Sequence, residues 1–511
     1  MNVAVYLIES IKKYGKCEQF IYVDHDKEVV ITNTQVDSNS RAVAGGLKSF
    51  GAEKGDIIGV MVSNIKEIPE LINGIMRMGS VFMPISPWFS PDEIRYILED
   101  SKTRILIIEN SMLLKLTEAF KGNTTVQKLV VLEAQNSDGS VWSYEDFTRQ
   151  DIDSGEVVDL ERDQLAMLVY TLSVTGPPRG VMLSHYNLIS SMLAGRDVWP
   201  SDRMDRFYIT IPMSNIYGCL FFFEALFNGS YLFLVPRFDP LRTLDIITHH
   251  KITVMPLVPT MIIAMMEKYN PNKHDLQSMK RFISVGTPIA EDTLTKAGET
   301  FGIRIYNCYG LAEAGSTVTR QRPNRLLKIR SVGSPIPSLE VKLVDHYTGK
   351  EMKNGETGEI IVKGGGIMQG YLNKPKETAE VLRGGWLYTG VLGRFDTDGD
   401  LYIVGHTKDL IMKGGEIIDP RIPEKILYKH PAVLAAAVIG IPDKKYGEEV
   451  AAVVVLRHDY KATEEELLGY LGNALHHFAI PKRIFFMDSF PQTEVGKILK
   501  SEIKKIILEK L

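Results

Sequence analysis

Short apolar segments alternate with helix-like segments through roughly the first 400 residues of this sequence. The segments Ile57–Val62, Ile105–Ile108 and Lys128–Leu132 are short and rich in β-branched residues, as buried strands are. Between such strands lie segments with helical spacing, including Glu67–Met78 and Pro91–Asp100. Alternation of this kind predicts an α/β fold whose layers include a largely parallel sheet.

The character of the sequence changes after about Ile329. Glycines and short strands dominate there, and we expect strands at Leu339–Asp345, Glu359–Lys363 and Leu401–Val404. This predicts a β-rich subdomain over about 329–404. A smaller α+β unit follows, because strand patterns and helix patterns both recur after Asp409. Single cores rarely grow beyond about 250–300 residues, so a chain of 511 residues has at least two domains.

Charge and cysteine use narrow the functional classes. The chain has 59 basic and 63 acidic residues and a formal net charge of −4, which gives no basis for nucleic-acid binding. Its three cysteines, Cys17, Cys219 and Cys308, are odd in number and far apart, so a disulfide framework is not expected. A reducing compartment fits this pattern, and we expect a cytoplasmic protein.

No segment has the pattern of a signal peptide or a membrane span. Met1–Lys16 lacks a basic start followed by an apolar block, and it is read as a short amphipathic helix. The most apolar stretch, Cys219–Pro236, is interrupted by Glu224, Asn228 and Gly229, so each part is too short to cross a bilayer. We therefore expect no transmembrane segment and interpret this stretch as buried core.

Tyr170–His185 reads YTLSVTGPPRGVMLSH, an apolar strand that runs into a loop of small and hydroxyl residues. Small residues allow backbone N–H groups and hydroxyls to surround a phosphate, and Arg179 can pair with its oxygens. The alternative is a surface turn with an incidental arginine.

Two further runs carry groups that suit nucleotide chemistry. Asn307–Glu313 reads NCYGLAE, in which Tyr309 can stack on a purine and Glu313 can hold Mg²⁺. The alternative is a strand end followed by a helix cap. Pro491–Lys500 reads PQTEVGKILK, and its Lys497 is by itself one more lysine in a lysine-rich tail.

Together these runs resemble the ordered motifs of the adenylate-forming superfamily, and most closely those of acyl-CoA synthetases. The first run is similar to YTSGTTGxPKGV, with Arg179 in place of the lysine, and the second to YGxTE. Gly405–Glu424 resembles a hinge and glycine-loop motif, and the last run resembles PxTxxGKxxR. The resemblance extends from about Glu28 to the end of the chain.

The resemblance implies an architecture and a set of cofactors. It implies a large N-terminal domain, 1–407, and a small mobile cap, 408–511, that moves about a hinge at Lys408–Asp409. ATP or AMP, Mg²⁺ and coenzyme A are the implied cofactors, and a small-molecule carboxylate is the implied substrate. A homodimer is possible, and a carrier protein remains an alternative to CoA as the acceptor.

The resemblance also implies residue roles. Lys497, Arg179 and Glu313 would be catalytic, and Glu313 and Thr175 would bind the metal. The carboxylate would lie against four residues: Asn215, Tyr217, Ile283 and Val285. Nucleotide and CoA would contact Thr171, Ser173, Thr175, Gly176, Gly286, Thr287, Tyr309, Gly310, Val391, His406, Lys408, Lys413, Gly414 and Gly415.

Several positions depart from the family pattern. Gly385–Arg394 reads GWLYTGVLGR, and Val391 stands where the family's aspartate accepts hydrogen bonds from both ribose hydroxyls. His406 replaces an arginine, Ala312 replaces a threonine, and the loop tip 172–174 is altered. Losing two hydrogen bonds to a charged group would weaken nucleotide binding by roughly 10²–10⁴-fold. For the run around Val391 the alternative is a glycine-rich turn.

These observations leave three functional hypotheses. The first is a carboxylate–CoA ligase that forms an acyl-adenylate from ATP and then transfers the fatty or aryl group to CoA. The second is a catalytically impaired relative that binds acyl-CoA or a partner without using ATP. The third keeps the fold for thioester transfer or hydrolysis without ATP, although no Ser/His/Asp arrangement is identifiable.

Overall fold

The computed structural model describes residues 1–24, 27–120, 125–134, 137, 139, 141–150, 155–171, 177–286, 289, 291–413, 416–472, 475, 479–492 and 498–510. The chain forms two compact units. The first comprises Met1–Val341, Ile361–Tyr388 and Gly399–Leu401, and the second comprises Lys342–Ile360, Thr389–Asp398 and Tyr402–Leu511. The predicted boundary between residues 407 and 408 and the hinge at Lys408–Asp409 stay predictions.

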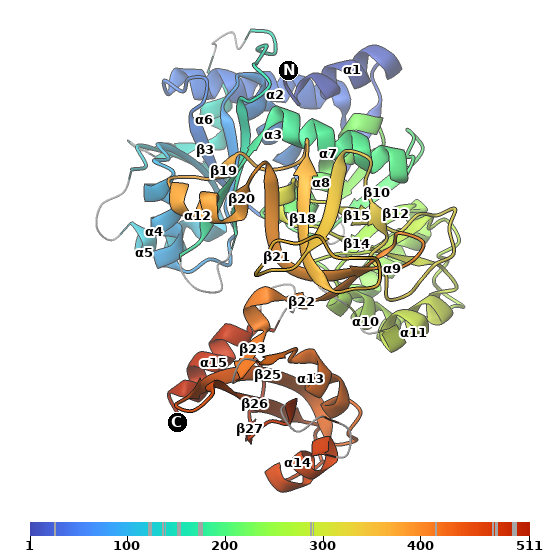
Figure 1. The fold of residues 1–511 in the computed structure, drawn as a ribbon. Helices are drawn as coiled ribbons and strands as arrows, with labels where there is room; N and C mark the ends of the chain where they lie inside the picture. Colours follow the sequence, from blue (N-terminus) through green and yellow to red (C-terminus); the bar gives the residue numbers. More distant parts are fainter. Residues whose placement is uncertain are drawn as a thin grey trace. The chain divides into compact units, whose positions relative to one another are not determined.

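An eight-stranded sheet of the first unit has the order β19-β9-β8-β4-β3-β5-β6-β7 (Figure 1). The strands from β8 to β7 pair in parallel, and β9 and β19 add antiparallel pairs at one edge. Its members are β3 (Ile57–Met61), β4 (Val81–Pro84), β5 (Ile105–Glu109), β6 (Lys128–Leu132), β7 (Val141–Ser143), β8 (Leu165–Thr171), β9 (Arg179–Ser184) and β19 (Gly370–Tyr371).

A nine-stranded sheet has the order β16-β15-β14-β13-β12-β10-β11-β1-β2. Its inner pairs are parallel, whereas β2, β15 and β16 join in antiparallel pairs at the edges. The strands are β1 (Glu18–Asp24), β2 (Lys27–Thr32), β10 (Arg206–Ile209), β11 (Tyr231–Leu234), β12 (Val254–Leu257), β13 (Arg281–Ser284), β14 (Ile305–Tyr309), β15 (Thr319–Arg320) and β16 (Ser334–Pro335). The largely parallel α/β fold predicted from strand–helix alternation is confirmed.

Helices separate and cover the two sheets (Figure 1). Between them α3 contacts β4, α7 contacts β8 and β9, α8 contacts β10 and β11, and α7 packs on α8. The helices of the first unit are α1 (Val5–Tyr14), α2 (Asn33–Ser49), α3 (Ile68–Arg77), α4 (Pro91–Asp100), α5 (Leu113–Ala119), α6 (Tyr144–Thr148), α7 (His185–Val198), α8 (Ile216–Asn228), α9 (Pro240–His250), α10 (Pro259–Lys268), α11 (Glu291–Phe301) and α12 (Pro375–Val381), with short 3₁₀ turns η1 (Asn110–Met112) and η2 (Ala312–Ala314).

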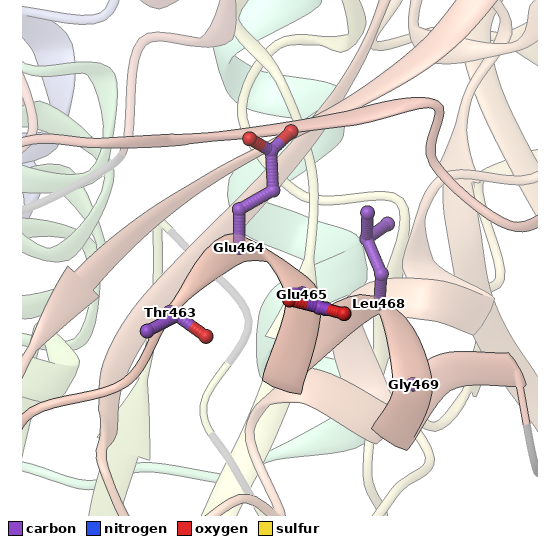
Figure 2. A pocket seen from close by; sticks show the side chains of 5 residues that line it. All are labelled: Thr463, Glu464, Glu465, Leu468 and Gly469. Atoms are coloured by element: carbon purple, nitrogen blue, oxygen red, sulfur yellow. The ribbon is translucent and has the colours of Figure 1, made fainter.

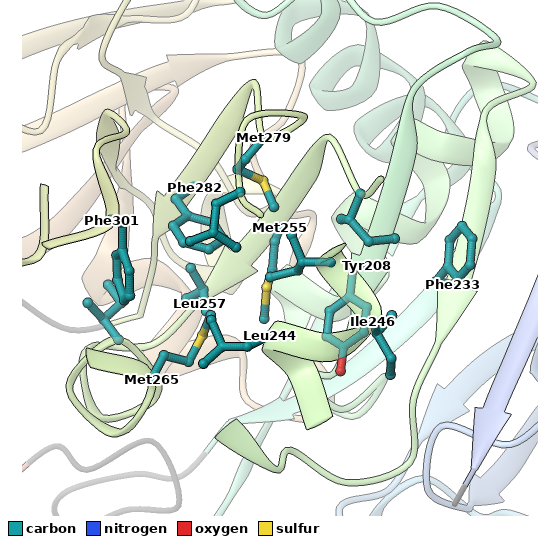
Figure 3. Packing of buried hydrophobic residues seen from close by; sticks show 14 of the residues in the cluster. Tyr208, Phe233, Leu244, Ile246, Met255, Leu257, Met265, Met279, Phe282 and Phe301 are labelled. Carbon is teal, nitrogen blue, oxygen red and sulfur yellow. The ribbon is translucent and has the colours of Figure 1, made fainter. Parts of the chain in front are cut away.

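The outer face of the nine-stranded sheet carries a large apolar core (Figure 3). Met255 and Phe282 point from β12 and β13 toward Leu244 of α9, Met265 of α10 and Phe301 of α11. Because side chains alternate along a strand, Ile283 lies on the opposite face from Phe282, toward the α7–α8 layer. This alternation places the predicted substrate residue Ile283 on the inner face of the sheet.

A five-stranded sheet follows in the sequence, with the order β17-β18-β21-β20 and β22 paired to β21. Its strands are β17 (Leu339–Val344), β18 (Gly358–Gly364), β20 (Leu382–Arg383), β21 (Trp386–Phe395) and β22 (Leu401–His406). The division between the two units falls inside β17, β18, β21 and β22. The strands expected in this β-rich region are present, and the alternative of a glycine-rich turn around Val391 is wrong because that run is a continuous strand, β21.

The rest of the second unit is a small α+β domain. Its sheet has the order β24-β23-β26-β25, with β27 parallel to β26, and apolar cores cover both faces. The elements are η3 (Thr407–Asp409), β23 (Ile411–Lys413), β24 (Glu416–Ile418), α13 (Arg421–Leu427), β25 (Val433–Asp443), β26 (Gly447–Leu456), α14 (Glu464–Gly472), β27 (Arg483–Phe486) and α15 (Lys500–Leu508). Among the helices that the structure describes, none combines the length and apolarity needed to cross a membrane.

Candidate functional site

The predicted phosphate loop has an ordered stem. Thr171 ends β8 and Arg179 begins β9, and the two residues pair across these antiparallel strands. Both side chains are half-buried. The stem therefore sets where the chain leaves the sheet and where it returns. The predicted residues Ser173, Thr175 and Gly176 lie outside the described residues.

Arg179 and Glu313 meet at one phenol. The Tyr371 hydroxyl donates a hydrogen bond to Glu313 Oε1 at 2.8 Å, and the Arg179 guanidinium carbon lies 5.4 Å from the centre of the Tyr371 ring. Burial and the nearby Glu313 charge raise the pKa of Tyr371, so its phenol stays protonated. The arrangement brings together two of the three predicted catalytic residues, from β9 and η2.

Sequence reasoning did not assign Tyr371 to the site. The residue lies in Gly370–Asn373, which reads GYLN, and it is 58 residues from Glu313. Its strand β19 pairs with β9, and this pairing carries the phenol to Arg179. The only sequence signal for Tyr371 was a tyrosine next to a glycine in a short edge strand. This signal does not indicate that Tyr371 contacts Glu313.

The segment around Tyr309 and Gly310 is closely packed. Tyr309 ends β14, and a Cβ at Gly310 would overlap the Ser316 carbonyl oxygen. Only glycine fits there without moving that backbone. Gly286 follows the adjacent parallel strand β13 with φ +86°, which also favours glycine. The carboxyl ends of β13 and β14 therefore lie at one edge of the sheet, while Thr287 falls outside the described residues.

The four predicted substrate residues are on neighbouring elements of the first unit. Ile283 and Val285 are fully buried at the end of β13. Asn215 caps α8, because its side-chain oxygen accepts a hydrogen bond from the Tyr217 N–H at 2.9 Å. Tyr217 is buried, and burial followed by the nearby Cys308 and Tyr309 raises the pKa of its phenol.

Val391 cannot replace the family's aspartate as a hydrogen-bond acceptor. Its side chain is buried in β21, and its backbone N–H donates to Thr389 Oγ1 at 3.1 Å. His406 ends β22 and begins the 3₁₀ turn that contains Lys408. Both predicted ribose positions, Val391 and His406, belong to the second unit.

The predicted CoA loop is a hairpin in the second unit. Lys413 of β23 pairs with Glu416 of β24, and Gly414 and Gly415 between them lie outside the described residues. The Lys413 ammonium is buried and forms an ion pair with Glu449. This pairing gives Lys413 a structural role, and its role in binding CoA stays a prediction.

Lys497 lies outside the described residues, but the element that follows it is well fixed. Lys500 begins α15 and forms an ion pair with Glu424 of α13 at 2.6 Å. Glu424 also accepts the Val438 N–H at 2.6 Å, and burial raises the pKa of this carboxyl. The ion pair anchors the chain three residues after Lys497, and the sequence analysis had not identified it.

Two surface depressions contain none of the predicted site residues. One lies at the start of α14 and is lined by Thr463, Glu464, Glu465, Leu468 and Gly469 (Figure 2). Glu464 already accepts hydrogen bonds from Ile484 and Arg483, so its carboxylate stabilises the fold. The other, of about 580 Å³, lies beside β2 and α2 and includes Glu70, which is hydrogen-bonded to Asn39 and Tyr144.

Comparison with known proteins identifies the family. The sequence profile of the AMP-binding enzymes matches residues 9–372, and the profile of the AMP-binding enzyme C-terminal domain matches residues 423–497. The first match covers more than half of the chain, and this chain belongs to the AMP-binding enzyme family.

Individual relatives agree with this assignment. The sequence is 30% identical to a long-chain-fatty-acid–CoA ligase of Bacillus subtilis, over 93% of this chain and 89% of that protein. It is 27% identical to 4-coumarate–CoA ligase CCL1 of Humulus lupulus, over 94% and 90% of the two chains. O-succinylbenzoate coenzyme A synthetase of Bacillus subtilis, solved with AMP, superposes with a TM-score of 0.84 at 26% identity over 98% of both chains. The family and the fold predicted from the motifs are confirmed.

Proposed function

We propose that this chain is an AMP-forming carboxylate–CoA ligase that uses ATP to activate a fatty or aryl acid. In the first step the carboxylate attacks the α-phosphate of ATP, which yields acyl-adenylate and pyrophosphate. In the second step the CoA thiolate attacks the adenylate, and AMP leaves. Family membership supports acid–CoA ligase activity in general, since the relatives are named as acid–CoA ligases.

The observation that supports activity is the grouping of Arg179, Tyr371 and Glu313 beside the loop stem. A guanidinium there can stabilise negative charge that develops on the phosphates. Lys497, from the second unit, would add a second positive charge in the adenylate-forming step.

The donor set also fits magnesium. Mg²⁺ is usually held by one or two carboxylates together with substrate phosphates, and Glu313 with the Thr175 hydroxyl would supply oxygen donors of that kind. The bound ion would neutralise phosphate charge. Tyr371 orients the Glu313 carboxylate through its hydrogen bond to Oε1.

A second candidate is supported by Val391. A relative that has lost the ribose contact would bind acyl-CoA without using ATP, and the buried apolar side chain at this position favours that reading. Thioester chemistry at a cysteine has less support. Burial raises the pKa values of Cys219 and Cys308 to about 12, so both thiols stay protonated and are poor nucleophiles.

Calorimetric titrations with ATP–Mg²⁺, CoA and an acyl-CoA separate the two candidates. The ligase reading predicts saturable ATP binding at millimolar concentration or below. Absence of ATP binding together with tight acyl-CoA binding would establish the second candidate. The homodimer, the cytoplasmic location and the choice of CoA over a carrier protein remain parts of the proposal that need their own measurements.

A further inference from the structure

A buried ion pair joins β15 to α8, the helix that carries the predicted substrate residue Tyr217. Arg320 of β15 donates through Nη2 to Glu224 of α8, and Arg320 has no solvent exposure. Gly195 of α7 makes room for the pair, because a Cβ there would overlap Glu224 Oε1 and lie 2.9 Å from Arg320 Nη1. Burying two charges is costly unless both are fully paired, so a pair at this depth calls for an explanation.

The pair lies on the face of α8 that begins with Tyr217. Residues 217, 221 and 224 follow helical spacing and share one side of the helix. The Arg320 guanidinium carbon lies 5.9 Å from the Phe221 ring and 4.4 Å from the Trp199 ring. The line of side chains therefore runs from the predicted acyl site to the ion pair.

The pairing of β15 with β14 also places Arg320 close to the predicted nucleotide motif. Arg320 pairs in register with Cys308, which directly precedes Tyr309 of the predicted nucleotide motif. Glu224 lies seven residues after Tyr217, which is ~10.5 Å along the helix axis. An extended chain of about eight or nine bonds covers this length, at the ~1.2 Å per bond of an extended backbone. An acyl group that started at the predicted site and followed α8 would reach the pair after that distance.

Two of the hydrogen-bond donor atoms of Arg320 are unsatisfied within the described part of the chain. Its Nε and Nη1 atoms are buried and have no hydrogen-bond partner among the residues that the structure describes. Buried donors of this kind carry a penalty that a bound acceptor would remove. Because Glu224 already neutralises the guanidinium charge, a neutral oxygen acceptor suits these donors better than a second carboxylate.

We propose that the Glu224–Arg320 pair closes the inner end of the acyl pocket and selects short carboxylic acids that carry a neutral oxygen acceptor near their far end. This inference rests on the proposed ligase function and names the substrate class of that same site. Long alkyl chains are excluded, because a methylene chain that reached the pair would separate its charges without replacing their interactions.

The test uses hydrolysis-resistant acyl-adenylates in which a sulfamate replaces the phosphate, so binding is measured without turnover. The acyl groups are nonanoyl, 8-oxononanoyl and hexadecanoyl, and calorimetry gives each Kd. In the wild-type protein we expect 8-oxononanoyl to bind about tenfold more tightly than nonanoyl, and hexadecanoyl to bind at least about a hundredfold more weakly. Equal binding of nonanoyl and hexadecanoyl by the wild-type protein overturns the proposal.

The double variant Glu224→Leu/Arg320→Met removes both charges at similar volume, a change that buried pairs often tolerate. It should lose the preference for 8-oxononanoyl and gain affinity for hexadecanoyl. The matched control is Asp37→Leu/Arg77→Met, which removes an ion pair between α2 and α3 of the same unit and should keep the wild-type order. A double variant at 224 and 320 that keeps that order also overturns the proposal.

The experiment separates this inference from the proposed function. If neither AMP nor any of the three adenylates binds the wild-type protein, the ligase reading itself fails. If AMP and the adenylates bind without regard to acyl length or oxygen content, only the role of the ion pair fails. The wild-type series decides between these outcomes even if the double variant does not fold.

Discussion

At position 391 the chain carries a valine where an acceptor for ribose hydroxyls is expected in this family. The side chain is 7% exposed, lies within a regular strand and, as a hydrocarbon, cannot accept a hydrogen bond. The groups proposed to act on the phosphates, Arg179 and Glu313, are retained. Under the proposed function, the chain keeps a positive charge at Arg179 and a carboxylate at Glu313 for the phosphates, and it lacks the ribose acceptor at position 391.

Restoring the acceptor should strengthen nucleotide binding. We expect Val391→Asp to raise the affinity for AMP by roughly 10²–10⁴-fold, because two hydrogen bonds to a charged group are regained. Calorimetry measures the affinity, and thermal unfolding checks that the new carboxylate is tolerated at this buried position. Val391→Leu is the control and should bind AMP as the wild-type protein does. An unchanged affinity in Val391→Asp would show that ribose is held elsewhere.

His185 links stability to pH. Burial, with a smaller contribution from the N-terminal ammonium, lowers its pKa to about 3, and its Nδ1 accepts the Val3 N–H at 3.1 Å. The unfolded state binds a proton at about pH 6.5 and the folded state does not, so stability is present above that pH and is lost as pH falls. Between pH 7 and pH 5 this residue should cost about 2 kcal/mol of unfolding free energy.

Urea unfolding at both pH values measures this effect. His185→Gln should reduce the difference between pH 7 and pH 5 by most of that amount. His458→Ala is the control, since that side chain is 97% exposed and should leave the difference unchanged. An equal loss of stability in wild-type and His185→Gln would assign the pH dependence to other groups.

At the scale of elements, the sequence predicted the bounds of a helix where a capping residue or a proline marks the helix terminus. Helix α4 has the predicted bounds, because Ser90 and Glu93 form a capping box and Pro91 occupies the first turn. The strand predicted at Ile57–Val62 ends instead at Met61. Periodicity fixes the type of an element better than its last residue.

Side-chain pairings between elements were beyond sequence reasoning. Glu224 and Arg320 are 96 residues apart, and Tyr371 reaches Glu313 across 58 residues. The local sequence around each of these residues does not indicate which residue it contacts. Only the packing of α7, α8 and β15, or the pairing of β19 with β9, shows which partner it meets.

The turn after β14 should be intolerant of any side chain. In Gly310→Ala the new Cβ would meet the Ser316 carbonyl oxygen, and the segment carrying Glu313 would have to move. We expect a loss of about 1–3 kcal/mol in unfolding free energy, together with weaker AMP binding. Thermal unfolding and calorimetry on the same sample measure both.

Gly469→Ala is the matched control, because that glycine lies within α14 and a Cβ there meets nothing within 4 Å. This change should stabilise the protein by about 0.5–1 kcal/mol, as glycine is unfavourable inside helices. If Gly310→Ala were equally neutral, the close packing described at this turn would not constrain the site.

At the scale of the whole molecule, the order of motifs along the chain predicted the family and the α/β architecture, and both are confirmed. The roles of individual site residues are a separate matter, since a fold hosts active and inactive members alike. Arg179 and Glu313 lie in the first unit, whereas Lys497 belongs to the second.

The most direct test of the account is pyrophosphate release in the presence of ATP, Mg²⁺ and a panel of short, aryl and long-chain carboxylic acids. The account predicts release that depends on the added acid, falls by about 10²-fold or more in Lys497→Ala, and is unchanged in Lys505→Ala on the exposed side of α15. If no acid in the panel produces pyrophosphate above the ATP-only rate, or if Lys497→Ala releases it as fast as the wild-type protein, the chain is not an AMP-forming ligase of the kind proposed.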